Sequence, residues 1–166
     1  MTGQELLEKL VDSYRSAFDI ERSFDINGDI YDAYAGFNVS SAKYVLMKKA
    51  ELWRADCYEH TFFSHKENLM VEDLERFQKE ITEYIEPKLV RGGEKCTQKN
   101  HMYTYITGIF IAEDGVTEEV KKAIRNYLFG FRGYSEARLL IFDMKNKKVI
   151  GNPAARELVK GYKKAF

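Results

Sequence analysis

Groups that can act as acids, bases, nucleophiles or metal ligands gather between residues 50 and 63. This stretch holds the only tryptophan, one of the two cysteines, one of the three histidines and three acidic residues. Within it, Asp56, Glu59 and His60 are candidate catalytic residues, because carboxylates and imidazoles are common proton carriers in enzymes. The same groups also suit a buried strand pair with a polar turn. In an extended strand neighbours alternate between faces, so we expect Glu59 and His60 to point apart.

The thiols and imidazoles form a second candidate set, with the number of ligands that tetrahedral zinc requires. Its members are Cys57, His60, Cys96 and His101. Neither the Cys57–His60 spacing nor the Cys96–His101 spacing is that of a familiar zinc knuckle, and no recognised nucleophile motif surrounds either cysteine. We therefore expect buried structural cysteines and predict no metal or other cofactor.

Two further groups suggest binding. The glycines and cations of residues 91–95 can wrap an anion, which makes Arg91 and Lys95 candidate binding residues. This segment lacks the Gly-Lys-Ser/Thr ending of a phosphate-binding loop, so we expect a solvated connection. Tyrosines at predicted strand positions, Tyr34 and Tyr58 among them, fit a small-molecule pocket, a partner surface or the rim of a core, and strand parity leaves these three open.

The composition predicts one folded domain over residues 1–166. An apolar fraction of 45% and a charged fraction of 31% are those of a folded protein. The N-terminus shows no signal-peptide pattern, and no apolar stretch approaches the roughly 20 residues of a membrane helix. With only two cysteines, we expect a cytoplasmic protein with reduced thiols and no membrane partner.

Charge is unevenly distributed along the chain although the net charge is zero. Residues 1–42 sum to −5 and residues 121–166, with 12 basic and 3 acidic side chains, sum to +9. A basic C-terminal third is typical of proteins that bind nucleic acid or another polyanion. Because the overall pI is about 6.8, we favour instead a basic end that meets the acidic end within the fold or in an oligomer.

Hydrophobic periodicity predicts a helix first, with Thr2 and Glu5 in a capping-box spacing at its start. A turn at Asn27-Gly28 and strands over residues 31–39, 43–53 and 58–64 follow, with short links that favour an antiparallel meander. In this region Trp53, Phe62 and Phe63 are expected to anchor the sheet, with Asp56 in a turn. A helical stripe over residues 69–85 should end at Pro87.

The second half of the chain predicts a β-α-β unit and a final helix. Residues 102–112 are apolar or aromatic at both odd and even positions, so both faces of this strand should be covered, as in the centre of a sheet. A helix from Thr117 should bury Val120, Ile124, Leu128 and Phe131, and residues 138–143 and 147–150 should form a hairpin. Asn152 is expected to cap the last helix, with Pro153 at its first position.

Together these elements predict a mixed α+β fold in the order α-β-β-β-α-β-α-β-β-α, with helices packed on one mixed sheet. Over residues 4–112 this order resembles the core topology of the restriction-endonuclease-like superfamily. The resemblance implies a metal-holding acid on the second strand and an acid-x-Lys pair on the third. The third strand here reads Glu59-His60-Thr61 and lacks that lysine, so we expect no intact nuclease site.

The function that these observations favour is a non-catalytic binding or interaction module, acting as a homodimer. The alternative is a nucleic-acid-acting enzyme, or a degenerate relative of the nuclease-like fold, that uses carboxylates such as Asp32, Asp56 and Glu59.

Overall fold

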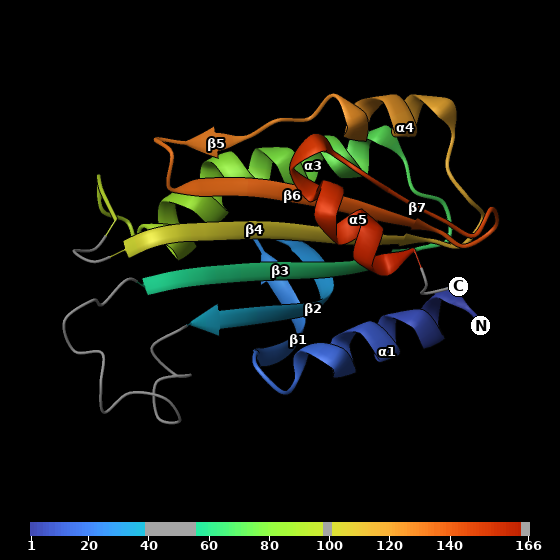
Figure 1. The fold of residues 1–166 in the computed structure, drawn as a ribbon, viewed down its shortest axis with the longest axis horizontal. Helices are drawn as coiled ribbons and strands as arrows, with labels where there is room; N and C mark the ends of the chain where they lie inside the picture. The colour runs from blue at the N-terminus through green and yellow to red at the C-terminus, as the bar shows by residue number, and fades with distance from the viewer. Residues whose placement is uncertain (39–55, 98–100, 164–166) are drawn as a thin grey trace.

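The computed structural model describes residues 1–38, 56–97 and 101–163, and within these ranges the strands form one seven-stranded mixed sheet (Figure 1). The strands are β1 (Asp19–Ile26), β2 (Asp29–Asn38), β3 (Asp56–Lys66), β4 (His101–Ala112), β5 (Gly130–Phe131), β6 (Ser135–Asp143) and β7 (Lys148–Gly151). The helices are α1 (Gly3–Tyr14), α3 (Val71–Glu80), α4 (Glu118–Arg125) and α5 (Arg156–Tyr162), with a π-helix η1 (Ile81–Val90) and a 3-10 turn η2 (Pro153–Ala155).

The topology is an antiparallel meander extended by parallel strands, as predicted. The sheet order is β1-β2-β3-β4-β6-β5, and β7 also pairs with β6. Strands β1, β2 and β3 pair antiparallel, whereas β3 pairs with β4 and β4 with β6 in parallel. The mixed α+β class is therefore confirmed, and the more specific restriction-endonuclease-like core stays a prediction.

Helices cover both faces of the sheet, which gives a three-layer arrangement. In Figure 1, α1 and α5 lie in front of the sheet, and α3, η1 and α4 lie behind it. The front core contains Leu6, Leu10, Ala33, Phe63, Ile109 and Leu140, and the rear core contains Phe62, Phe77, Ile85, Ile106, Leu139 and Ile141. Phe62 and Phe63 are 1% and 0% exposed, so each anchors one face of β3 as expected.

The N-terminal helix forms as its sequence predicts. The Thr2 hydroxyl accepts a hydrogen bond from Glu5 N, and Thr2 N donates to the Glu5 carboxylate, which completes the capping box. Leu6, Leu10 and Val11 are buried against the sheet. The helix thus starts where the cap satisfies its free amides and lies on the face that its apolar stripe defines.

The meander contains a strand that the sequence reading missed. Strand β1 precedes the predicted turn at Asn27-Gly28, whose residues adopt φ of 53° and 96°. The exposed polar side chains of β1 hide its strand character, because it lies at the edge of the sheet. The predicted strand over residues 43–53, with Trp53, lies outside the described residues.

The predicted end of the second helix at Pro87 is wrong. Helix α3 continues into η1, which contains Pro87 and ends at Val90. A proline lacks an amide donor and crowds the preceding turn of an α-helix, and the wider π-helical winding accommodates both. As a consequence, Leu89 and Val90 lie on the helix and over the sheet rather than in a loop.

The C-terminal half follows the prediction except at the end of α4. Thr117 caps α4, and Val120 and Ile124 are buried. Leu128 is 72% exposed, contrary to expectation. Helix α4 ends at Arg125, so the helical spacing that directs Val120 and Ile124 to the core does not extend to Leu128. Asn152 caps the final helical segment as predicted.

Candidate functional site

Strand β3 presents its candidate residues to opposite faces of the sheet, as predicted from parity. Glu59 lies on the face of α1 and α5, where it pairs with Arg138, and His60 lies on the opposite face, where it contacts Tyr34. The side chains of Asp56 and Cys57 lie outside the described residues. Glu59 and His60 therefore belong to two different environments, and the proposed catalytic set stays a prediction.

Glu59 forms the centre of a hydrogen-bonded ion pair across three strands. Its carboxylate accepts from Arg138 Nη2 at 2.6 Å, from Thr107 Oγ1 at 3.0 Å and from Thr61 Oγ1 at 3.2 Å. The Arg138 guanidinium lies 3.8 Å from the centroid of the Tyr105 ring. The Arg138 and Glu59 side chains are 13% and 19% exposed, so this pair is largely desolvated and held rigidly.

Two tyrosines from the flanking helices lie close to this pair. The hydroxyls of Tyr14 in α1 and Tyr162 in α5 share a hydrogen bond of 3.2 Å. Burial raises the pKa of both phenols, and the negative charge of Glu59 adds to this rise. The tyrosines are thus neutral at physiological pH and join α1 to α5 beside the ion pair.

His60 and His101 line one cavity on the other face of the sheet, with a volume of about 460 Å³. His60 Nδ1 and the Tyr34 hydroxyl share a hydrogen bond of 2.6 Å, and His101 stacks on Tyr58 with an interplanar angle of 5°. Burial lowers the pKa of His60 to about 4. The imidazole of His60 is therefore neutral near pH 7 and acts as a hydrogen-bonding group without charge.

The four candidate metal ligands are only partly brought together. His60 and His101 share the cavity, but Cys96 is exposed elsewhere, where Arg132 Nη1 approaches its sulfur to 3.8 Å. Within residues 1–38, 56–97 and 101–163, no group of three or more potential ligands is placed to hold a metal ion. The expectation of buried cysteines is wrong for Cys96, because it lies on an exposed turn.

Of the two loop candidates, Arg91 stabilises the protein's own structure. Arg91 binds both carboxylate oxygens of Glu86, at 2.8 and 2.9 Å, and donates to the carbonyls of Glu94 and Lys95. Its guanidinium also lies 4.7 Å from the Phe131 ring centroid. Arg91 thus fixes the end of η1, whereas the exposed Lys95 side chain has no ion-pair partner among the residues described.

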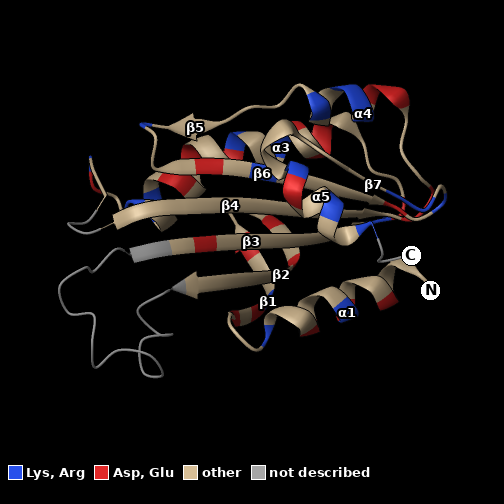
Figure 2. Ribbon diagram, viewed as in Figure 1, with Lys and Arg blue, Asp and Glu red and all other residues tan. Residues whose placement is uncertain are grey.

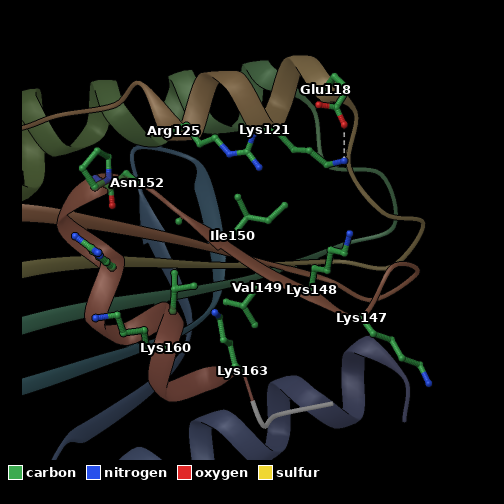
Figure 3. A pocket seen from close by; sticks show the side chains of 14 residues that line it. Glu118, Lys121, Arg125, Lys147, Lys148, Val149, Ile150, Asn152, Lys160 and Lys163 are labelled. Carbon is green, nitrogen blue, oxygen red and sulfur yellow. Dashed lines mark hydrogen bonds and ion pairs between the residues drawn. The ribbon is translucent and has the colours of Figure 1, made fainter.

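A basic groove with a volume of about 940 Å³ lies at the edge of the sheet. It lies between α4 and α5, over the short edge strand β7, and Figure 3 shows Arg125 and Lys121 on α4, with the Lys121 amine at Glu118. Figure 2 shows basic residues, with some acidic ones among them, on α4, α5 and the β6–β7 hairpin. Its basic lining residues are Lys121, Arg125, Lys147, Lys148, Arg156, Lys160 and Lys163, and Glu118 is its acidic one.

In the described part of the chain, two of these seven cations form ion pairs. Lys121 pairs with Glu118 at 2.6 Å and Lys160 with Glu157 at 2.7 Å. The other five basic lining residues form no ion pair with any residue in the described ranges. Among the described residues, no ion pair joins an acidic side chain of residues 1–38 to a cation of residues 121–163. The predicted meeting of the two charged ends within one chain is therefore not found there.

Buried contacts hold the groove in shape. Asn152, 2% exposed, accepts from Leu139 N at 2.9 Å and donates to Ala137 O at 2.9 Å and to Tyr127 O at 3.2 Å. A side chain at Gly151 would meet Val159 at 2.7 Å, so this glycine lets α5 approach β7 closely. The three elements that carry the cations are thereby packed in a defined arrangement.

Comparison with known proteins places the chain in a family without an assigned activity. Its fold is a mixed sheet between two helical layers, with a basic groove at one edge and an aromatic cavity on one face. Residues 2–164 match the family described as "Domain of unknown function (DUF8052)", and the chain belongs to that family. No curated protein and no solved structure matches the chain. None of the helices within the described ranges is long and apolar enough to cross a membrane.

The sequence indicated several of the candidate residues but not the residues that they contact in the fold. Arg138 shares strand parity with the buried Leu140 and Phe142, which is a signal for a charge on a covered face that needs a partner. The basic groove was visible only as a C-terminal charge excess. Its construction depends on three elements meeting at a sheet edge, which charge counting does not reveal.

Proposed function

We propose that this protein is a non-catalytic binding module whose basic groove holds a small ligand carrying several phosphate groups. The observation that carries the proposal is a set of five cations that line one concavity and form no ion pair with a described residue. Because like charges repel, bringing these cations together lowers the stability of the fold. An anion bound in the groove offsets that repulsion. The groove thus favours ligands with more than one negative charge.

The size and lining of the groove favour a small ligand. Its volume of about 940 Å³ is within the range of small-molecule sites, roughly 300–1,000 Å³. None of the described residues that line the groove is aromatic. Sites for single-stranded nucleic acid, in contrast, stack bases on aromatic rings. Lysine, a compact point charge suited to phosphate, supplies five of the seven lining cations.

A competing explanation is that lysines on β7 only protect the sheet edge from pairing with another chain. That role needs exposed charges on the strand itself, as Lys148 provides. It does not need Arg125 and Lys121, which line the same groove from the separate element α4 (Figure 3). The convergence of cations from separate elements therefore supports binding.

We extend the proposal to a homodimer in the cytoplasm. The separation of charge, −5 over residues 1–42 and +9 over residues 121–166, supports contact between the acidic part of one copy and the basic part of another. Such a dimer weakens as salt rises. Sedimentation velocity at low and high salt measures this directly, and a monomer at both salt concentrations contradicts the dimer.

The experiment that tests the proposed ligand class is calorimetric titration with inorganic tripolyphosphate. The double variant Arg125→Glu/Lys148→Glu should weaken binding by roughly tenfold or more, because two attractive charges become repulsive. The matched control is Lys122→Glu, since Lys122 is exposed on the same helix but does not line the groove. It should change the affinity by less than about twofold.

A second arm of the titration separates the alternative function. A short DNA duplex that binds more tightly than tripolyphosphate, with a steep salt dependence, would favour the nucleic-acid-acting alternative. Absence of tripolyphosphate binding, or an equal loss in the Lys122→Glu control, would refute the groove as a phosphate site.

A further inference from the structure

The cavity that contains His60 and His101 lies apart from the basic groove and has no lining residue in common with it. It is formed where β2, β3 and β4 meet the end of η1, on the face of the sheet opposite α1 and α5. Its lining residues are Asp19, Tyr34, Gly36, Phe37, Tyr58, His60, Leu89, Val90, Gly92 and His101. The cavity volume of about 460 Å³ is that of a small-molecule site.

Aromatic rings make up half of this lining, and four of them are organised in parallel pairs. Tyr34 and His60 have ring centroids 5.9 Å apart and an interplanar angle of 13°. Tyr58 and His101 have centroids 5.5 Å apart and an angle of 5°. All four side chains are only half-buried. Rigid flat surfaces that the core leaves partly exposed are suited to stacking on a planar ligand.

The sequence provides space for this arrangement at Gly36. A Cβ atom at this position would lie 2.9 Å from the Tyr34 hydroxyl oxygen and 3.3 Å from Cζ of the same ring. Gly36 also faces His60 in the β2–β3 register. The absence of a side chain therefore lets the Tyr34 ring lie across β2 and reach His60 Nδ1. The aromatic wall depends on this glycine.

The charge of the cavity limits the kind of ligand. Among the described residues that line it there is no lysine or arginine, and Asp19 at the exposed rim is the one carboxylate. Burial keeps His60 neutral, because its pKa is lowered to about 4. Of the charges on the described lining residues, an anion would meet the negative charge of Asp19. Leu89 and Val90 from η1 add apolar surface, which favours an uncharged ring over a sugar or another fully polar molecule.

We propose that this cavity binds an uncharged planar heteroaromatic molecule of one or two fused rings. The ligand stacks on the aromatic wall, contacts Leu89 and Val90 with its other surface, and exchanges hydrogen bonds with the His60–Tyr34 pair. His60 Nε2 has no hydrogen-bond partner among the described residues. We assign it the hydrogen bond to a polar atom at the edge of the ligand ring. This site is independent of the phosphate-binding proposal.

The imidazole signals of the three histidines test this assignment in the intact protein by NMR. The probes are adenosine, guanosine, indole and quinoline at millimolar concentration. We expect at least one of them to shift the signals of His60 and His101. His65 is the internal control, because it pairs with Glu113 and does not line the cavity. Ribose should shift none of the three. The site is refuted if no probe shifts the His60 and His101 signals, or if His65 responds equally.

Charge selectivity provides the second test. Adenosine 5′-monophosphate should bind roughly tenfold more weakly than adenosine, and Asp19→Lys should remove most of this difference by strengthening the binding of the monophosphate. Asp19 is exposed, so the substitution should not affect folding. Glu67→Lys, an exposed change outside the lining, is the matched control. Equal binding of the nucleoside and the nucleotide by the unmodified protein would overturn the proposed selectivity. The variants of the basic groove should bind the probes normally.

Discussion

Arg138 in β6 and Glu59 in β3 form an ion pair of 2.6 Å that spans the intervening strand β4. Thr107 lies between them and donates to the same Glu59 oxygen while accepting from Arg138 at 3.1 Å. A carboxylate engaged in this way is held by protein groups from three strands. Glu59, one of the candidate catalytic residues of the sequence, thus has contacts that stabilise the sheet.

Replacing Arg138 by methionine should lower the free energy of unfolding by about 3–5 kcal/mol, because it leaves Glu59 largely buried without its partner. Urea-induced unfolding measures this. The double variant Arg138→Met/Glu59→Leu should recover much of the loss, since no unpaired charge remains. A single variant as stable as the unmodified protein would show that water reaches and solvates Glu59.

Asn152→Ala should destabilise the protein by about 2–4 kcal/mol, because several backbone groups lose their buried partners. The side chain bonds to Leu139 N, Ala137 O, Tyr127 O and Ala155 N. Thermal unfolding should show a lower midpoint. Lys160→Ala, an exposed change in α5, is the control and should have little effect. If Asn152→Ala is no worse than this control, the hydrogen bonds contribute nothing net.

The buried carboxyl of Glu80 should make the protein less stable as pH rises. Burial raises the pKa of Glu80 to about 8, and the nearby Asp29 adds to this, whereas the hydrogen bond from the Tyr31 hydroxyl opposes it. The unfolded chain releases this proton near pH 4.5 and the folded chain only near pH 8, so stability falls between these values.

The variant Glu80→Gln tests this linkage. It should be more stable than the unmodified protein at pH 8, by at least about 1 kcal/mol, which corresponds to a shift of one pKa unit. Urea unfolding at pH 5 and pH 8 gives both values. If the advantage of Glu80→Gln is the same at both pH values, Glu80 does not have a raised pKa.

His60 should produce the opposite dependence in acid. Burial lowers its pKa from 6.5 to about 4, so the unfolded chain takes up a proton as pH falls through 6.5 while the folded chain does not. Stability from this group is complete above about pH 6.5 and decreases as pH falls toward 4. The NMR signals of His60 should stay constant between pH 8 and 5.5, and a full titration in that range would contradict the prediction.

The sequence predicted those elements whose signals are local. The capping box of α1, the turn at Asn27-Gly28 and the cap at Asn152 each depend on side chains a few residues apart. The central position of β4 followed from its two apolar faces. In contrast, β1 and the continuation through Pro87 were missed, because an edge strand can be polar and because packing of η1 on the sheet outweighs the local cost of proline.

The sequence by itself determined the mixed fold class, the opposite directions of Glu59 and His60 and the basic character of the C-terminal third. Only the tertiary structure decided what these residues meet. Glu59 gained Arg138 from a strand 79 positions later, His60 gained Tyr34, and the C-terminal cations gathered around β7. The physical reason is that strand register and helix packing select partners far apart in the chain, and a side chain's burial and chemistry depend on those partners.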